Sequence, residues 1–155
     1  MRTAKTVFVT VLLVAAPLTV LAFWPWSSGP QELASQEGVL RIPVSSLGDG
    51  RAHHYQTRAA DGTRVIFFAV KDAQGRIRTA VDACDVCYKA GKGFVQDGSF
   101  MVCENCGQRF AISRIGEVKG GCNPAPLPAT IEDNEVRILT SDIDLNSGYA
   151  KYRRL

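Results

Sequence analysis

Residues 64–87, RVIFFAVKDAQGRIRTAVDACDVC, carry the strongest structural signal in this sequence. Val65–Val70 is continuously apolar and rich in β-branched and aromatic residues, which predicts a strand over Val65–Lys71 that is buried on both faces. The turn-forming residues Asp72–Gly75 follow, and then comes a second strand-like run, Ile77–Ala83. The pattern is a buried strand, a turn, and another strand that leads into the first pair of cysteines.

Short strand-like runs continue on both sides of this stretch, separated by turn signals such as Gly48-Asp49-Gly50 and Asp61-Gly62. No long helical pattern follows residue 28. The proline-rich segment Pro124–Pro128 cannot lie in a central strand, so we expect it in a loop or at an edge. The sequence therefore predicts an all-β domain, a small sandwich or barrel. Its remaining strands are expected at Val39–Val44, His54–Arg58, Phe100–Val102 and Val136–Leu139.

The charge balance excludes a general nucleic-acid-binding role. The chain has 155 residues, a length that favours one domain. Its 18 Lys and Arg residues face 15 Asp and Glu residues, and two of those cations, Arg2 and Lys5, precede the long apolar run at the start. The remainder is almost neutral, whereas a nucleic-acid-binding surface is basic. We expect no nucleic-acid partner.

The first 28 residues are predicted to be a membrane anchor or a signal segment. Val7–Trp26 is a run of 20 uncharged residues, and a helix of this length spans about 30 Å, the thickness of a bilayer core. Arg2 and Lys5 place its amino terminus in the cytoplasm, and Trp24 and Trp26 suit the far interface. The alternative is secretion after cleavage near Ala22. Both interpretations put the working domain outside the cytoplasm, after a polar linker at 29–38.

Two C-x-x-C motifs carry the chemistry of this sequence. Cys84 and Cys87 form the first and Cys103 and Cys106 the second, with 15 residues between the pairs. Such a loop turns both sulfurs toward one point and directs backbone N–H groups at them, so two loops supply a four-sulfur set for a soft metal or an iron–sulfur cluster. Plain disulfides are an alternative in an oxidising compartment. A redox-active dithiol lacks the expected βαβ context.

The segments CENCGQRF (103–110) and GGCNPAPLP (120–128) resemble the second ligand box of Rieske [2Fe–2S] domains and the proline loop that follows it. Those domains are small β-sandwiches that hold the cluster between loops. Rieske proteins use two cysteines and two histidines, whereas Cys87 and Cys106 occupy the histidine positions here. The resemblance therefore implies a Rieske-like sandwich or barrel with an all-thiolate cluster, for which the high Rieske potential is not expected.

A closer resemblance is to the FtrD-like membrane iron–sulfur protein domain. It is carried by the segments DACDVCY (82–88), KGF (92–94), MVC (101–103), NCG (105–107) and GGCNP (120–124). The similarity covers roughly 39–140 within a predicted domain at 39–155. It implies a bacterial membrane protein linked with ferrous iron uptake. The implied cluster, a [2Fe–2S] centre, would have Cys84, Cys87, Cys103 and Cys106 as its ligands.

Cys122 is the fifth, unpaired cysteine, and two interpretations stay open. It is either a small buried residue in a tight turn or an alternative ligand or redox partner of the centre. For His53 and His54 the sequence favours a surface or packing role, because no spacing links them to the cysteines. Lys89, Lys92 and Arg109 either offset the charge of a thiolate centre or form a solvated rim.

Three functions are compatible with these residues, and no hydrolase, P-loop or metalloprotease motif is present. The leading hypothesis is a non-enzymatic electron carrier, single-pass in the bacterial inner membrane, with its domain in the periplasm or outside the cell. Its partner would be a membrane permease or a redox protein of an iron-uptake system. The alternatives are a structural zinc ribbon and a thiolate metallochaperone for iron or copper. Phe94, Phe110 and the segment 124–128 are expected to cover a redox centre, which favours the first hypothesis.

Overall fold

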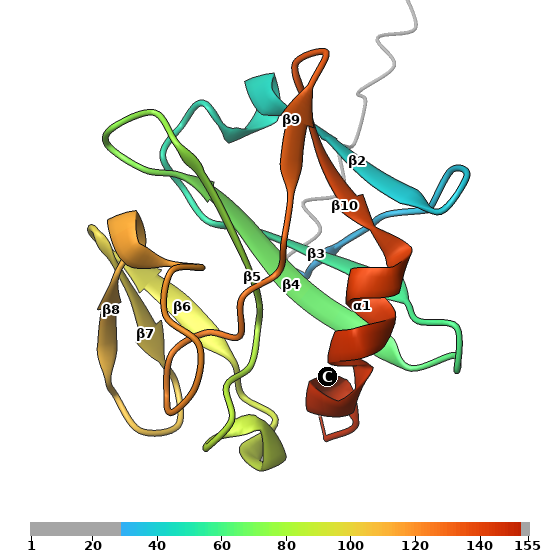
Figure 1. Cartoon of the computed structure of the whole chain (residues 1–155). Helices are drawn as coiled ribbons and strands as arrows, with labels where there is room; N and C mark the ends of the chain where they lie inside the picture. Colours follow the sequence, from blue (N-terminus) through green and yellow to red (C-terminus); the bar gives the residue numbers. More distant parts are fainter. Residues whose placement is uncertain (1–28, 153–155) are drawn as a thin grey trace, which may run out of the picture.

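The computed structural model describes residues 29–152 as three small β-sheets with one short α-helix near the end (Figure 1). The predicted anchor at Val7–Trp26 lies outside the described residues. Within residues 29–152, no helix is both long enough and apolar enough to cross a membrane. The all-β prediction is confirmed for the described part of the chain.

The central sheet has the strand order β1-β3-β4-β5, and a second sheet has the order β2-β10-β9. A third, small sheet, β6-β7-β8, carries the second pair of cysteines. The strands are β1 (Gln31–Glu32), β2 (Val39–Pro43), β3 (His53–Arg58), β4 (Arg64–Lys71), β5 (Ile77–Val81), β6 (Phe94–Asp97), β7 (Phe100–Cys103), β8 (Arg109–Ala111), β9 (Thr130–Glu132) and β10 (Glu135–Leu139). The helix α1 spans Thr140–Asn146, and short 3-10 turns lie at Val44–Leu47, Tyr88–Ala90, Ile112–Arg114 and Ser147–Ala150.

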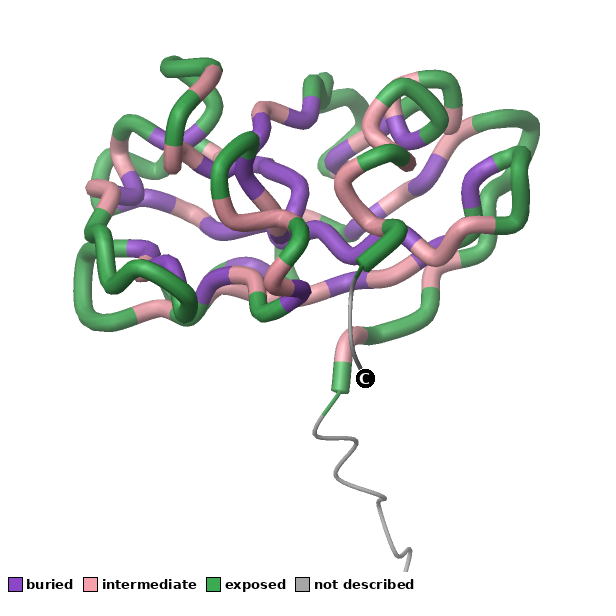
Figure 2. Tube along the Cα trace, turned by 90° about the horizontal axis from the view of Figure 1, so that it is seen from below, coloured by how far each residue is buried: buried purple, intermediate pink, exposed green. Residues whose placement is uncertain are grey.

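Strand β4 lies between two hydrophobic cores and is buried on both faces, as its apolar run predicts. Side chains alternate across a strand, so Val65, Phe67 and Ala69 belong to one core, and Phe68 and Val70 belong to another. Phe67 and Phe68 are fully buried, and each contributes about 1.5–3 kcal/mol through loss of apolar surface. The buried residues therefore run through the middle of the molecule, with exposed loops around them (Figure 2).

The two cores stabilise different parts of the molecule. The first lies between β4 and the β2-β10-β9 sheet, where α1 adds Ile143. The second lies between β4 and the β6-β7-β8 sheet and includes Phe94 and Met101 together with the buried cysteines Cys84 and Cys103. The first core stabilises the scaffold, and the second anchors the cysteine loops.

Several elements differ from the sequence prediction. The segment expected to be a linker contains β1, which pairs in parallel with β3. Strands β6, β8 and β9 were not expected; β8 and β9 have three residues each and no buried residue, so they leave no apolar pattern. Strand β5 ends at Val81, two residues before its expected end; the N–H of Asp82 still donates to the carbonyl of Ile66 in β4, and the carbonyl of Ala83 accepts the N–H of Ala125.

The proline-rich segment is at a sheet edge, as expected. Pro126 forms an isolated bridge to Ala80 of β5. On either side of it, the carbonyl of Ala125 accepts the N–H of Val81 at 2.8 Å, and the carbonyl of Leu127 accepts the hydroxyl of Thr79 at 2.6 Å. Pro126 has no N–H to donate, so its neighbours make these bonds. The segment thereby extends the central sheet beyond β5 and fixes the chain that follows Cys122.

Candidate metal centre

The first knuckle, Cys84–Cys87, begins three residues after β5. The N–H of Cys87 donates to the Sγ of Cys84 at 3.2 Å, and the N–H of Tyr88 donates to the carbonyl of Cys84 at 3.1 Å. A 3-10 turn follows and ends at Gly91, whose φ is +66°. Since only glycine adopts this conformation easily, Gly91 lets the chain turn back toward β6. The first knuckle is therefore a tight loop with a backbone donor directed at its first sulfur.

The second knuckle, Cys103–Cys106, closes the hairpin between β7 and β8. The N–H of Cys103 donates to the carbonyl of Gln108 at 2.9 Å, and the N–H of Gly107 donates to the carbonyl of Cys103 at 2.8 Å. Gly107 has a φ of +73°, as expected for the residue after a knuckle. The N–H of Glu104 reaches the carbonyl of Gly93 at 2.9 Å. That bond ties the second knuckle to the chain that leaves the first.

Cys122 approaches the two knuckles from a third segment of the chain. Gly120 and Gly121 both have positive φ values, +98° and +63°, which let the backbone turn sharply just before the cysteine. The side chain of Asn123 donates to the carbonyl of Gly120 at 3.0 Å and closes the turn. A Cβ placed on Gly120 would lie 3.7 Å from the carboxylate of Asp85, so this turn rests against the first knuckle.

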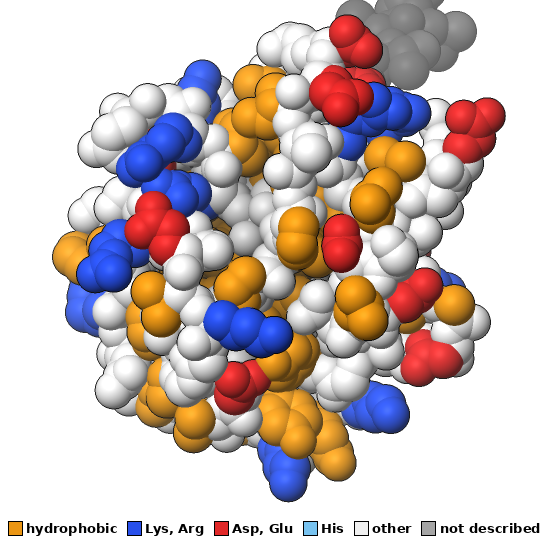
Figure 3. Space-filling model, in the orientation of Figure 1, with side chains coloured by type: hydrophobic (Ala, Val, Ile, Leu, Met, Phe, Trp, Pro, Cys, Tyr) orange, Lys and Arg blue, Asp and Glu red, His pale blue; other side chains and the backbone are white. Residues whose placement is uncertain are grey.

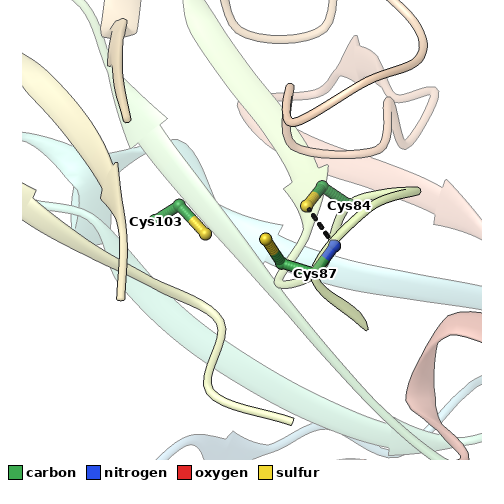
Figure 4. Close-up of side chains that lie close together, drawn as sticks. All are labelled: Cys84, Cys87 and Cys103. Atoms are coloured by element: carbon green, nitrogen blue, oxygen red, sulfur yellow. Dashed lines mark hydrogen bonds between the residues drawn. The ribbon is translucent and has the colours of Figure 1, made fainter. Parts of the chain in front are cut away.

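The five sulfurs form two groups of three. The first sulfur group contains Cys84, Cys87 and Cys103, and the second contains Cys87, Cys106 and Cys122; within each group all sulfurs lie within 4.8 Å of one another. In Figure 4 the side chains of the first group point toward one another from two different loops. All five cysteines are free thiols. The structure thus brings together the four cysteines predicted as ligands and adds Cys122, with Cys87 common to both groups.

The two groups differ in burial. Cys84 and Cys103 are buried, Cys87 and Cys122 are half-buried, and Cys106 is exposed. Phe94 packs in the second core behind the buried sulfurs, with its ring 6.5 Å from that of Phe68 and 6.1 Å from that of Phe110. The proline-rich segment bonds through its backbone to the edge of β5, and its expected role as a cover of the centre stays a prediction. The centre is therefore backed by aromatic rings and open on the side of Cys106.

Hydrogen bonds and burial set the acidity of the thiols in opposite directions. Burial raises the pKa of Cys103, although backbone N–H groups of its own knuckle oppose the effect. A hydrogen bond from the backbone N–H of Gln108 lowers the pKa of Cys106, and the neighbouring thiols add to the effect. Burial, followed by the hydrogen bond with Cys106, raises the pKa of Cys122 to about 12. The exposed thiol is thus the best prepared to bind as a thiolate.

Three groups around the centre could not be assigned from sequence. The side-chain amide of Asn105 donates to the Sγ of Cys87 at 3.4 Å. The buried carboxylate of Asp82 accepts the N–H of Phe94 at 2.7 Å and holds the start of β6. The hydroxyl of Tyr149 donates a hydrogen bond to the carboxylate of Asp85, a residue that lies between the two cysteines of the first knuckle. Asp82 and Asn105 are next to the motifs, whereas no sequence signal links Tyr149 to a residue 64 positions away.

The histidines lie outside both sulfur groups. His53 pairs with Asp49 at 2.8 Å. The ring of His54 packs against Phe68 with a centroid distance of 5.7 Å, and its Nε2 lies 3.8 Å from Asp82. These positions match the predicted surface and packing roles.

The flanking cations have local partners as well. Arg109 pairs with Asp97 and stacks on Phe100. The ammonium of Lys89 lies 6.0 Å from the centre of the Tyr88 ring. In Figure 3, basic side chains are spread over the face that is shown, and some of them lie beside exposed apolar side chains. These contacts favour the interpretation of Lys89 and Arg109 as a rim around the centre.

The loops of this β-domain bring together five thiols, a donor set that can hold a soft metal or an iron–sulfur cluster. Residues 47–149 match the family described as membrane iron-sulfur containing protein FtrD-like, and the chain belongs to this family. The resemblance to the FtrD-like family seen in the sequence is confirmed. No curated protein matches the chain. The thiol-only donor set and the backbone N–H directed at Cys84 fit the cluster that the family description names.

Proposed function

We propose that this chain is an electron carrier of iron uptake, with a [2Fe–2S] cluster held by Cys84, Cys87, Cys103 and Cys106. The observation that carries the proposal is the division of the sulfurs into two groups that share Cys87. A single tetrahedral zinc with bonds of about 2.3 Å would draw its four sulfurs to about 3.8 Å from one another. Cys106 belongs only to the second group and Cys84 only to the first, so the predicted ligands favour two metal positions over one.

The chain's own groups suit electron transfer. A bound cluster would supply a one-electron redox couple. Buried Cys84 and Cys103 anchor the inner side in the second core, and exposed Cys106 presents the outer side to a partner. The Cys87 N–H and the Asn105 amide donate to sulfurs, and such bonds help to set the potential of a thiolate cluster.

The proposed protein is anchored in the membrane. The apolar run Val7–Trp26 would hold the protein in the bacterial inner membrane by a single pass, with the domain at 39–155 on the periplasmic side. A permease or redox protein of an iron-uptake system would then exchange electrons at the Cys106 side. The resemblance to Rieske ligand boxes, with cysteine in place of histidine, supports the loop arrangement and an all-thiolate centre.

The test is reversible reduction of the full-length protein, purified in detergent without oxygen. We expect a visible absorption spectrum that bleaches with dithionite and returns with ferricyanide. The Cys84→Ala/Cys103→Ala double variant should lose the chromophore, because three thiols remain. Val86→Ala is the matched control, since Val86 lies in the same knuckle and is exposed. A wild-type protein that shows no reducible chromophore after anaerobic cluster reconstitution would leave the structural zinc ribbon as the better hypothesis.

A further inference from the structure

Cys122 lies in a loop that is shaped to bring it to the centre. The two positive-φ glycines before it and the side-chain bond of Asn123 to Gly120 fix the turn. The turn packs against the first knuckle near Asp85, and the chain after it is bonded to the edge of β5. A cysteine that merely filled a core would not need to share a 4.8 Å neighbourhood with two other sulfurs.

The second sulfur group contains one thiol more than a cluster needs there. A [2Fe–2S] cluster takes four thiolates, two for each iron. Cys84 and Cys103 occur only in the first group, so they account for one iron. Cys87, Cys106 and Cys122 then offer three sulfurs for the two places on the other iron.

We propose that Cys122 is an alternate ligand of the outer iron and takes the place of Cys106 when that thiol is unavailable. The inference rests on the proposed function. In the exchange, the Cys122 thiol gives up its proton and forms the new iron–sulfur bond, while the Cys106 sulfur leaves the iron and takes up a proton. No electrons are gained or lost. Cys106 is the ligand to be replaced, since it is the exposed thiol and the others are buried or half-buried.

The exchange has a consequence for how the protein works. Because Cys106 is at the surface, it is the thiol most open to oxidants and to partner proteins outside the cytoplasm. A half-buried reserve thiol would let the chain release Cys106 without losing its cluster. Four thiolates would remain in place throughout, two for each iron.

The test is a two-residue cycle with alanine, which offers no ligand atom. Full-length wild type, Cys106→Ala, Cys122→Ala and the double variant are purified without oxygen, and iron, acid-labile sulfide and the electron paramagnetic resonance spectrum of the reduced protein are measured. We expect both single variants to keep wild-type iron and sulfide and the double variant to lose them. Cys106→Ala should also show shifted resonance positions, because a different set of thiols holds the outer iron.

Loss of the cluster in Cys106→Ala as complete as in the double variant overturns the inference and leaves the proposed function standing with its four ligands. Loss of the cluster in Cys122→Ala, or its retention in the double variant, overturns the inference together with the assignment of the outer ligands, although the protein would still be an iron–sulfur protein. A wild-type protein without iron and sulfide instead rejects the proposed function, and the inference with it. Far-UV circular dichroism melting of the metal-free variants separates loss of a ligand from failure to fold.

Discussion

Gly107 ends the second knuckle and allows the contribution of one backbone conformation to be measured. Its φ is +73°, and a Cβ added there would have nothing within 4 Å. Gly107→Ala therefore introduces no clash, and its cost is that of holding an L-residue in the left-handed region, about 1–2 kcal/mol. Gly62 is the matched control, because its φ is +80° and it has the same open surroundings in the β3–β4 turn, away from the cysteines.

Both substitutions should lower the free energy of unfolding of the metal-free protein by about the same amount, 1–2 kcal/mol. In a domain of this size each kcal/mol lowers Tm by roughly 3–6 °C, which far-UV circular dichroism resolves. Only Gly107→Ala should also weaken cluster retention, because the Gly107 N–H donates to the carbonyl of Cys103. Gly107→Asn should be milder, since Asn tolerates this conformation.

The reasoning would be refuted by Gly107→Ala melting with the wild type while Gly62→Ala is destabilised. A loss above about 3 kcal/mol at Gly107 would be equally contrary, because it would require a clash that the geometry does not contain. Equal cluster retention in the two variants would show that the second knuckle does not depend on this turn.

Three further predictions concern the scaffold and the membrane segment. Asp72 is buried and accepts hydrogen bonds from Arg76 and Arg78; burial opposes ionisation, but these bonds prevail and hold its pKa below the usual value. Asp72→Asn should therefore destabilise the domain at neutral pH by about 1–3 kcal/mol. In urea melts at a series of pH values, the difference in stability between the variant and the wild type should shrink as the pH falls below about 4. A difference that stays constant down to pH 2 would contradict this. Phe94→Ala should cost about 3–5 kcal/mol, because Phe94 is buried against Phe68, and Phe94→Leu should cost less; equal melts for the two would count against the aromatic backing of the centre. The full-length chain should remain in the membrane pellet after alkaline washing, whereas residues 29–155 should be soluble and folded; a mature chain starting at Phe23 in the soluble periplasm would reject the anchor.

Much of the scaffold follows from local sequence patterns. Val65–Val70 has an apolar side chain at every position, so a strand buried on both faces was predictable from this run alone. Strand β9 was not, because all three of its residues are exposed and it owes its place to pairing with β10. Strand β1 has only two residues, and its pairing with β3 is parallel and distant in sequence. Short, exposed or distant pairings leave no periodic signal.

Part of the candidate centre was likewise predictable from the sequence, and part was not. The spacing of each C-x-x-C motif and the glycine after it predict a local loop, and both loops are present. The convergence of the loops depends on the β6–β7 hairpin and on the bond between Glu104 and Gly93, which spacing does not encode. The place of Cys122 was open in the sequence because it depends on how the chain after Gly121 packs against β5.

The central claim is that these loops hold a two-iron cluster, and elemental analysis tests it most directly. Full-length protein purified without oxygen should contain about two irons and two acid-labile sulfides per chain, with little zinc. About one zinc per chain with no sulfide, unchanged after anaerobic reconstitution with iron and sulfide, would contradict the account.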